Sequence, residues 1–272
     1  MSTISALLPK LSKLSREGQL ELAARLRENV ARHEPRRQLY RYYPDTGPLR
    51  RELYVRHMEF FRAGGVHEPI ENWCPEGCDG TPHRERLALC ANRIGQTEGI
   101  GGYELTLHLT GRYPPWWEGH KLERPIDAWA CGKQNETTRD ILQRKLLGPV
   151  IWSGGQKICA GTGLIPGEDI GDITWKRGIA DFIDTARIRN KFGGWSLLAM
   201  KSYEQKRGSF EGTEKDIVLC DEEPPLEIYT EIHIRLMTRR GHALLTFTPS
   251  EGMSEVVQAF LPGGRLPGEA VA

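Results

Sequence analysis

The sequence predicts an α/β fold, in which a central, mainly parallel β-sheet is flanked by helices and preceded by an N-terminal helical segment. Short apolar runs bounded by turn-forming residues alternate with longer stretches of helical periodicity. This alternation is typical of a parallel sheet that is covered on both faces. The chain has 272 residues, which is long enough for one large domain and a small appendage.

Four apolar runs are predicted strands, and they cover residues 87–90, 126–130, 217–220 and 243–248. Between and around them, helical spacing predicts helices over about 50–63, from Thr97 onward, over 137–147 and over 224–237. The last helix is expected to place Leu226, Tyr229, Leu236 and Met237 on its inner side. The segment 185–203 breaks the alternation, and its two runs around Gly193-Gly194 predict an inserted hairpin.

An amphipathic helix is predicted over residues 16–32, with Ser15 as its cap. The favoured interpretation is that this helix packs on the main domain, and the alternative is that it docks a partner. Residues 1–45 are thus expected to form a helical segment and connector, residues 46–262 the main domain, and residues 263–272 a tail.

Composition excludes several classes of protein. Lys and Arg number 37 against 36 Asp and Glu, so a nucleic-acid surface must be a local patch and not a global basic field. No apolar run approaches the roughly 20 residues of a membrane span, and the N-terminus does not read as a signal peptide. Three of the six cysteines (Cys90, Cys131, Cys220) end or follow apolar runs, which favours buried thiols in a reducing, cytoplasmic setting.

A phosphate loop is predicted after the first strand. The run Leu87–Leu89 leads into a loop, then Gly95, and then a hydroxyl residue, Thr97, that opens a helix. In this layout, backbone N–H groups and a helix N-terminus converge on an anion. In the usual G-x-x-x-x-G-K-[ST] pattern, Cys90 occupies the first glycine position and Gln96 the lysine position.

An acidic strand end provides the second chemical signal. Residues 217–220 end abruptly in Asp221-Glu222-Glu223, where open α/β sheets bind ligands. An Asp there can hold Mg²⁺, and the adjacent Glu can act as a general base toward water. Glu223 alone fits the alternative of a solvated acidic loop that caps the next helix. The strand 243–248 carries Thr246 and Thr248 at its end, which suits either a γ-phosphate sensor or a β-rich edge.

His67, Cys74, Cys78 and His83 lie in one loop rich in Pro and Gly. Cys-x3-Cys with two flanking histidines allows a zinc site. The loose spacing favours the alternative, which is a surface insertion with two free thiols.

The motifs and their order resemble the ATPase domain of the large terminase subunit of tailed bacteriophages. The likeness covers about residues 50–262 and is carried by ANRIGQTEG, YELTLHLTGRYPPWWEG, TTRDILQRKLLGPV, GTGLIPGEDI, SYEQKRGSFEGTEKDIVLCDEEPP and LLTFTPSEGMSEVVQAFLP. The resemblance implies a P-loop NTPase of the ASCE type that uses ATP and Mg²⁺ to drive double-stranded viral DNA into a procapsid. It also implies a homo-oligomeric ring on a portal protein, a small terminase subunit as partner, and action in the cytoplasm of the bacterial host, away from any membrane.

The resemblance also assigns roles to residues. Asp221 and Thr97 would hold Mg²⁺, and Glu222 would activate water. The phosphates would be bound by residues 92–98, namely Asn92, Arg93, Ile94, Gly95, Gln96, Thr97 and Glu98. Arg93 would also stabilise charge in the transition state, while Thr246 and Thr248 would couple hydrolysis to motion.

Two departures from the family pattern bear on activity. Gln96 replaces the lysine, and losing about 3 kcal/mol of charge stabilisation would slow the chemistry roughly a hundredfold. The chain also stops where the linker to a C-terminal nuclease domain would begin, so no nuclease activity is expected from it. The alternatives are a nucleotide-binding but hydrolysis-impaired remnant or assembly subunit, and a helicase-like ATPase.

Overall fold

The computed structural model describes residues 15, 18, 38–70, 74, 77–89, 95–248 and 254–261. The helix predicted over 16–32 therefore lies outside the described residues, apart from Gly18. The amide of Gly18 donates a hydrogen bond to Oγ of Ser15 at 3.2 Å. None of the described helices is long and apolar enough to cross a bilayer.

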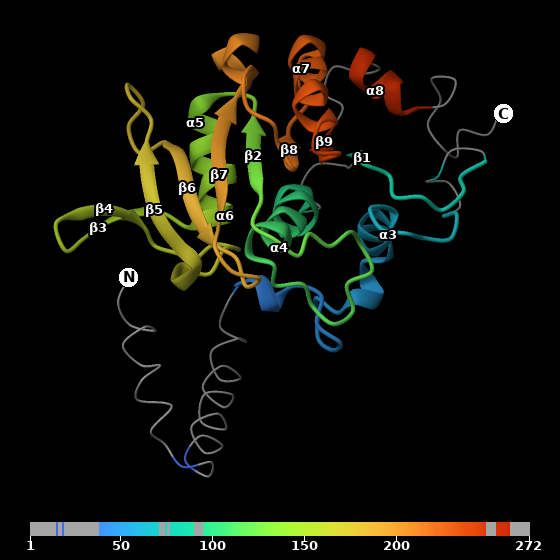
Figure 1. Cartoon of the computed structure of the whole chain (residues 1–272), viewed down its shortest axis with the longest axis horizontal. Coiled ribbons are helices and arrows are strands. Elements are labelled where there is room, and N and C mark those ends of the chain that lie inside the picture. The colour runs from blue at the N-terminus through green and yellow to red at the C-terminus, as the bar shows by residue number, and fades with distance from the viewer. Residues whose placement is uncertain are drawn as a thin grey trace.

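In the described part of the chain, seven strands form one mixed sheet (Figure 1). Their order is β1-β9-β8-β2-β7-β6-β5. The first five strands in this order are mutually parallel, and β6 and β5 complete the sheet in antiparallel fashion. The strands are β1 (Glu85–Leu89), β2 (Asp127–Gly132), β5 (Ile170–Trp175), β6 (Ile183–Arg189), β7 (Trp195–Ser202), β8 (Ile217–Asp221) and β9 (His242–Phe247). The mainly parallel sheet that the sequence predicts is confirmed, and the four predicted strands are β1, β2, β8 and β9.

The predicted helices are also present, with shifted bounds. They are α3 (Val55–Ala63), the π-type turn η4 (Gln96–Gly102) with α4 (Tyr103–Thr110), the continuous run α5 (Asn135–Thr137), η5 (Thr138–Gln143) and α6 (Arg144–Leu147), and α7 (Leu226–Met237). A short helix, α8 (Glu255–Phe260), follows β9. Single 3₁₀ turns occur at η2 (Gln38–Arg41), η3 (Arg51–Leu53), η6 (Gly167–Asp169), η7 (Tyr203–Gln205) and η8 (Arg207–Phe210).

The hairpin around Gly193-Gly194 is real, but it is not an insertion. Its second strand, β7, pairs in parallel with β2 and so belongs to the central sheet. Leu198 and Met200 are fully buried on β7, because every second side chain of the strand packs into the core. Strand β5 and a separate hairpin of β3 (Val150–Ser153) and β4 (Gln156–Cys159) were not predicted from the sequence.

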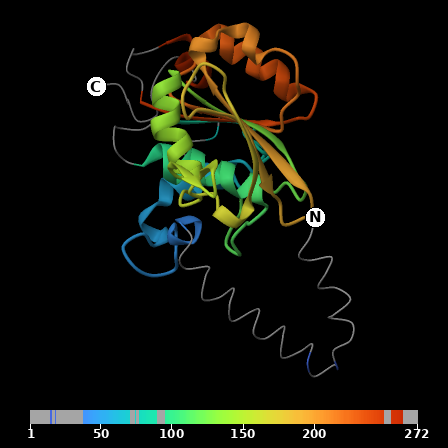
Figure 2. The same cartoon turned by 90° about the vertical axis from the view of Figure 1, so that its left-hand side faces the viewer.

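The sheet is sandwiched between two layers of helices (Figures 1 and 2). Helices α3, α4 and α6 pack on one face with Ile217 and Leu219, and α7 and α8 pack on the other face with Val218 and Cys220. Successive residues of a strand point to opposite faces. Since Asp221 is an odd-numbered residue of β8, its side chain is on the same face as α4.

Helix α7 is correctly predicted, but its inner face is rotated from the expected one. Ile228, Tyr229, Ile232 and Leu236 are buried, whereas Leu226 and Met237 are 43% and 73% exposed. Leu226 and Met237 are the first and last residues of α7. At these ends the apolar face of the helix no longer packs against the sheet.

Residues 38–43, which the sequence analysis assigned to the connector, contribute to the core. Leu39 and Tyr43 are buried in the same cluster as Phe61 and Tyr103. The Tyr43 hydroxyl donates a hydrogen bond to the carbonyl oxygen of Gly99 at 2.6 Å. The end of the N-terminal segment is therefore fixed to the turn η4, and the domain limits at 45 and 262 remain predictions.

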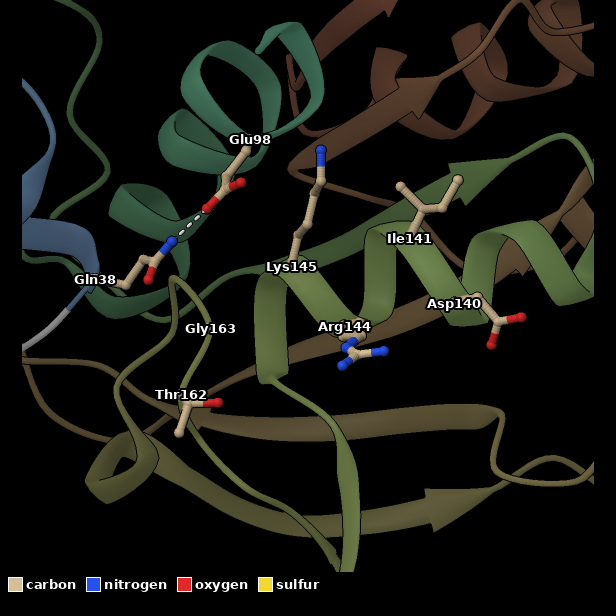
Figure 3. Close-up of a pocket in the computed structure, with 8 residues that line it drawn as sticks. All are labelled: Gln38, Glu98, Asp140, Ile141, Arg144, Lys145, Thr162 and Gly163. Carbon is tan, nitrogen blue, oxygen red and sulfur yellow. Dashed lines mark hydrogen bonds between the residues drawn. The ribbon is translucent and has the colours of Figure 1, made fainter. Parts of the chain in front are cut away.

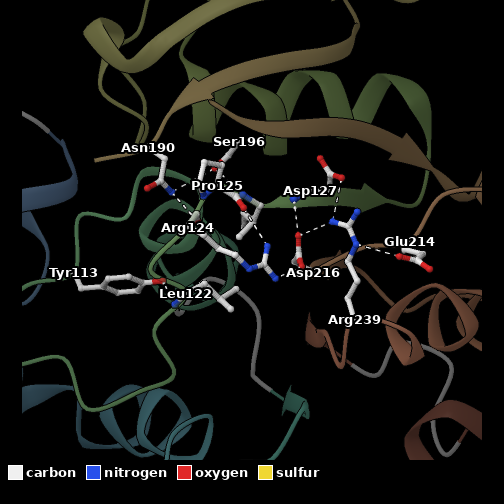
Figure 4. A network of polar contacts seen from close by, with 11 residues as sticks. Tyr113, Leu122, Arg124, Pro125, Asp127, Asn190, Ser196, Glu214, Asp216 and Arg239 are labelled. Atoms are coloured by element: carbon white, nitrogen blue, oxygen red, sulfur yellow. Dashed lines mark hydrogen bonds and ion pairs between the residues drawn. The ribbon is translucent and has the colours of Figure 1, made fainter. Parts of the chain in front are cut away.

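A polar network closes the edge of the sheet at which β2 and β8 begin (Figure 4). The buried Asp216 carboxylate accepts hydrogen bonds from Arg124 at 2.6 Å, from Arg239 at 3.0 Å and from the amide of Asp127 at 2.8 Å. Burial acts to raise the pKa of Asp216, but the hydrogen bonds from Arg124 and the Asp127 amide, together with the charges of Arg124 and Arg239, hold this pKa below its ordinary value. This network stabilises the edge opposite to the one where the predicted site lies.

The described cysteines form no disulfide bond, and Cys131, Cys159 and Cys220 are buried. The burial of Cys131 and Cys220 confirms that these two thiols are buried, as the sequence predicts. Cys90 lies outside the described residues.

Candidate functional site

Three parallel strands meet at the edge where the sequence places its polar residues. The strand register aligns Ala88 of β1, Thr246 of β9 and Asp221 of β8 in one row. Strand β9 lies between the strand that leads into the phosphate loop and the strand that ends in acids. Because all three strands run in the same direction, their carboxyl ends share one edge, where ligands bind in open α/β sheets.

The Asp221 carboxylate lies between two hydroxyl groups. The hydroxyl of Thr246, which is fully buried, donates to Oδ1 of Asp221 at 3.2 Å. The hydroxyl of Thr97, in the first turn after the phosphate loop, also forms a hydrogen bond with this carboxylate. A carboxylate and a threonine hydroxyl on adjacent elements are oxygen ligands of the kind Mg²⁺ takes, so this pair fits a magnesium ion.

Burial dominates the electrostatics of Asp221. Only 7% of the residue is exposed. Burial raises its pKa to about 6, even though the Thr97 hydroxyl and the charge of Lys145 act in the opposite direction, and the charge of Glu222 adds to the rise. An uncompensated buried carboxylate is costly, so the site favours a cation beside Asp221.

Glu222 follows directly and differs from Asp221 in its environment, because its side chain is exposed. Its backbone has φ +92°, a region that residues other than glycine rarely adopt. Two hydrogen bonds hold this conformation: the Glu222 amide donates to the Thr246 carbonyl at 3.2 Å, and the Tyr203 hydroxyl donates to the Glu222 carbonyl at 2.9 Å. Strained residues of this kind cluster at functional sites.

The phosphate loop itself is described only from Gly95 onward. Cys90, Asn92, Arg93 and Ile94 lie outside the described residues, so their predicted roles stay predictions. Gly95 has φ +81° and caps the start of η4, so the predicted phosphate loop leads into a helix N-terminus, a position that can bind anions.

Gln96, at the lysine position, is half-buried. Within the described part of the chain its Oε1 atom is buried and has no hydrogen-bond partner. A buried acceptor without a donor is unusual in a folded protein. A lysine ammonium has only donor hydrogens, so it would leave no acceptor unsatisfied at this point, whereas the Gln96 amide does.

The glycines after Thr97 allow close packing. A Cβ atom on Gly101 would lie 2.4 Å from Cδ1 of Leu219 and 3.0 Å from Cγ2 of Thr246. Only glycine lets η4 approach the sheet this closely. This close contact between η4 and the sheet brings Thr97 to Asp221.

A pocket of about 340 Å³ opens beside the turn η4 (Figure 3). Its lining includes Glu98, Lys145 and Arg144. The Lys145 side chain extends from α6 toward η4 (Figure 3), and its positive charge acts on Asp221. Among the described residues no hydrogen bond or ion pair is formed by its ammonium group. Lys145 carries no signal in the sequence, because a lysine in the last turn of a helix is ordinary.

Glu98 was grouped with the phosphate-binding residues. Its carboxylate accepts a hydrogen bond from Nε2 of Gln38, as Figure 3 shows, and interacts with Tyr42. The side chain therefore faces the N-terminal segment. Thr248 is half-buried and follows β9. The hydroxyl of Thr246, the other predicted coupling residue, contacts Asp221.

Cys74, Cys78 and His83 lie together between α3 and β1. His83 precedes the first residue of β1, whereas the phosphate loop follows its last residue. The length of β1 separates the cluster from the predicted phosphate loop by on the order of 15 Å. The cluster is therefore distinct from the predicted nucleotide site.

A turn at a helix N-terminus, an acidic strand end and an additional strand between them define the class of P-loop NTPases of the ASCE type. The family model for the large terminase subunit, T4-like-virus type, N-terminal part, matches residues 87–267. The chain therefore belongs to this terminase family.

A curated relative agrees with the family match. The chain is 31% identical over 270 residues to the terminase large subunit of Salmonella phage P22, and the alignment covers 92% of the chain. It covers 48% of that relative, so the chain spans about half the length of the curated protein it matches. A solved large terminase from a thermophilic bacteriophage, in complex with ADP, matches with 14% identity and a TM-score of 0.36, covering 58% of this chain and 31% of the other.

Proposed function

We propose that this chain is the ATP-hydrolysing part of a terminase large subunit, and that it drives double-stranded DNA into a procapsid. One observation carries the proposal: the Asp221 carboxylate, at the shared edge of β1, β9 and β8, interacts with the hydroxyls of Thr97 and Thr246. This links the helix after the phosphate loop, the acidic strand and the strand between them at a single point. Membership of the terminase family supports the assignment of this point to nucleotide hydrolysis.

Each residue has a defined task in this proposal. Asp221 and Thr97 hold Mg²⁺, which neutralises charge on the phosphates when bound. Glu222, exposed next to the buried Asp221, accepts the proton of the attacking water as general base. The N–H groups at the start of η4 bind the phosphates, together with residues 92–95. Thr246 senses the occupancy of the site through its hydrogen bond to Asp221.

Lys145 supplies positive charge that Gln96 lacks. Its ammonium group extends toward η4, acts on Asp221 and has no ion-pair partner among the described residues. The lysine side chain has a flexible stem and a compact charge, which allow it to reach phosphate oxygens from a neighbouring helix. Lys145 lies on such a helix, α6. Arg93 is the second cation of the proposal, from within the loop itself.

The partners follow from the family. The proposal includes double-stranded DNA, a portal protein, a small terminase subunit and a homo-oligomeric ring of this chain on the portal. It places the reaction in the cytoplasm of a bacterial host.

The test is Mg²⁺-dependent ATP hydrolysis, with and without duplex DNA, by the native chain, by Gln96→Lys and by Glu222→Ala. We expect turnover by the native chain, a rise of up to about a hundredfold in Gln96→Lys, and loss of turnover in Glu222→Ala. Nucleotide binding, measured separately by titration, should persist in Glu222→Ala.

The pattern of results separates the candidates. Turnover only after Gln96→Lys would favour the second candidate, a nucleotide-binding but hydrolysis-impaired terminase subunit, for which Gln96 is the supporting observation. Absence of both binding and hydrolysis in native and Gln96→Lys chains would overturn the proposal.

A further inference from the structure

Four side chains with metal-binding atoms converge between α3 and β1. His67 and His83 each contribute a ring nitrogen, and Cys74 and Cys78 each contribute a sulfur. These ligand atoms all lie within 4.8 Å of one another. The cluster precedes residues 87–267, which the family model matches, and it plays no part in the proposed nucleotide chemistry.

The distances within the cluster are those of a tetrahedral site. Nε2 of His67 lies 3.3 Å from Sγ of Cys74 and 3.7 Å from Sγ of Cys78. Nε2 of His83 lies 3.4 Å and 3.6 Å from the same two sulfurs. For tetrahedral zinc, with Zn–S of about 2.3 Å and Zn–N of about 2.0–2.1 Å, the expected nitrogen–sulfur edge is about 3.5 Å. All four measured edges fall within a few tenths of an ångström of this value.

Hydrogen bonding alone accounts poorly for this arrangement. Nδ1 of His67 lies 2.9 Å from the Gly65 carbonyl oxygen, which assigns the ring proton to Nδ1 and leaves a lone pair on Nε2. Each nitrogen contacts both sulfurs, but a thiol has a single proton to donate. A cation at the centre would satisfy every one of these lone pairs at once.

The surroundings stabilise sulfur as an acceptor and fix the imidazole. The amide of Ile70 donates to Sγ of Cys74 at 3.3 Å, and the amide of Gly80 donates to Sγ of Cys78 at 3.4 Å. The bond from His67 to the Gly65 carbonyl orients the ring. Outer hydrogen bonds to ligand atoms of this type are typical of metal sites.

The backbone is shaped for this convergence. Gly77 and Gly80 have φ of +78° and +81°, and a Cβ on Gly80 would lie 2.2 Å from the His67 carbonyl oxygen. The His67 amide donates to the Gly80 carbonyl at 3.0 Å, and the His83 amide donates to Ala63, the last residue of α3, at 2.9 Å. The loop therefore folds back on itself and holds both histidines against both cysteines.

We propose that His67, Cys74, Cys78 and His83 form a closed, structural Zn²⁺ site that joins the end of α3 to the start of β1. Two sulfurs and two imidazole nitrogens in tetrahedral positions suit zinc. The protein fills every coordination position, so the site holds structure and carries no open position for a substrate. The site is connected to the predicted phosphate loop through β1, whose opposite end leads into that loop.

The test is the metal content of the full chain, purified without a histidine tag and dialysed against buffer with trace zinc. We expect about one zinc per chain, and a fall of at least about tenfold in Cys74→Ser and in Cys78→Ser. Cys159→Ala is the matched control, because Cys159 is a buried thiol outside the cluster, and it should retain its zinc.

A ligand exchange tests the geometry without depending on nucleotide hydrolysis. His83→Cys should keep zinc, since cysteine is also a zinc ligand, whereas His83→Ala should lose it. Cobalt replacement should give the absorption of tetrahedral thiolate ligation in the native chain and not in Cys78→Ser. Chelation should lower the melting temperature of the native chain and leave that of Cys78→Ser unchanged.

Three results would overturn the proposal: a native chain that stays free of zinc after dialysis, a zinc content unchanged in both cysteine variants, or a disulfide bond between Cys74 and Cys78 in the native protein. All of these are measured on metal and thiols. They are therefore independent of whether the chain hydrolyses ATP.

Discussion

The hydroxyl of Tyr203 donates a hydrogen bond to the backbone carbonyl of Glu222 at 2.9 Å. Tyr203 follows β7 directly, and Glu222 follows β8. The Tyr203 hydroxyl thus holds the carbonyl of Glu222, the residue proposed as general base. The Thr246 carbonyl on β9 holds the Glu222 amide. Because Glu222 has φ +92°, these two bonds oppose a conformational preference of on the order of 1–3 kcal/mol.

Removal of this hydroxyl should affect chemistry more than binding. We expect Tyr203→Phe to lower kcat for ATP by about 2- to 10-fold, the equivalent of one hydrogen bond, with the affinity for nucleotide nearly unchanged. Tyr229→Phe is the matched control, because the Tyr229 hydroxyl donates a bond of 2.8 Å to Glu85 at the other end of the sheet. Equal losses of kcat in the two variants would refute a positioning role for Tyr203.

Burial of Asp221 should make the nucleotide-free protein more stable in mild acid. The folded-state pKa is about 6 and the ordinary value is 3.8. Above pH 6 the Asp221 carboxylate is ionised in both the folded and the unfolded state. The folded state is then destabilised, because the charged carboxylate is buried in it. As the pH falls from 6 toward 3.8, the folded state takes up the proton first, and this cost disappears.

The measurement is urea unfolding of the native chain and of Asp221→Asn at several pH values. At pH 7.5 the variant should be more stable by on the order of 1–3 kcal/mol, and the difference should shrink by about 2 kcal/mol at pH 4.5. Nucleotide and magnesium are left out, so that the titration of phosphate does not interfere. A difference that is constant across this range would show that Asp221 keeps an ordinary pKa.

Lys145 and a lysine introduced at position 96 should supply the same positive charge, so that either one can compensate for loss of the other. Lys145→Met should weaken binding of ATP by on the order of 10-fold or more, as expected for a lost hydrogen bond to a charged group. In the Gln96→Lys background the same change should cost much less. Arg144→Met is the control, since Arg144 lines the same pocket and is exposed. Equal losses from Lys145→Met in both backgrounds would contradict the idea that Lys145 compensates for Gln96.

The layout of the sheet could be predicted because its strands carry strong local signals. The run 217–220 is apolar on both faces and ends in acids, so both the strand and its ligand edge were visible in the sequence. The place of β9 between β1 and β8 was not predicted from the sequence, and it is this order that brings Thr246 to Asp221.

What could not be predicted depends on contacts between distant residues. The partly exposed, alternating pattern of β5 has no strong apolar run, and Lys145 is significant only because α6 lies beside η4. The four residues of the proposed zinc site have loose spacing in the sequence. The turns at Gly77 and Gly80, which have positive φ, help to bring them together. Periodicity cannot indicate such convergence.

A buried ion pair connects the two elements that flank the phosphate loop. Arg86 of β1 contacts both carboxylate oxygens of Glu104 in α4, at 2.7 and 3.0 Å. Both side chains are almost fully buried, and Arg86 also donates to the Phe60 carbonyl at 2.8 Å. Burial acts to raise the pKa of Glu104, but the charge and hydrogen bonds of Arg86, together with those of His108, lower this pKa to about 2.

Breaking this pair should destabilise the chain strongly. We expect Glu104→Gln to lower the free energy of unfolding by about 3–5 kcal/mol, because it leaves a buried guanidinium without its counter-charge. Replacement of both residues by Met should cost less than either single change. Glu59→Gln is the control, because it removes a surface ion pair with Arg56 (3.0 Å). This change should lower the free energy of unfolding by less than about 1 kcal/mol.

The acid dependence gives a second, independent check on the same pair. The contribution of Glu104 is fully present above its ordinary pKa of 4.5 and is lost as the pH falls toward 2. The native chain should therefore lose stability relative to the double Met variant in this window, as measured by thermal unfolding. Since the pair fixes β1 to α4 on either side of the loop, Glu104→Gln should also weaken nucleotide binding under conditions where it is still folded. A folded Glu104→Gln variant with native affinity would show that the pair acts on stability alone.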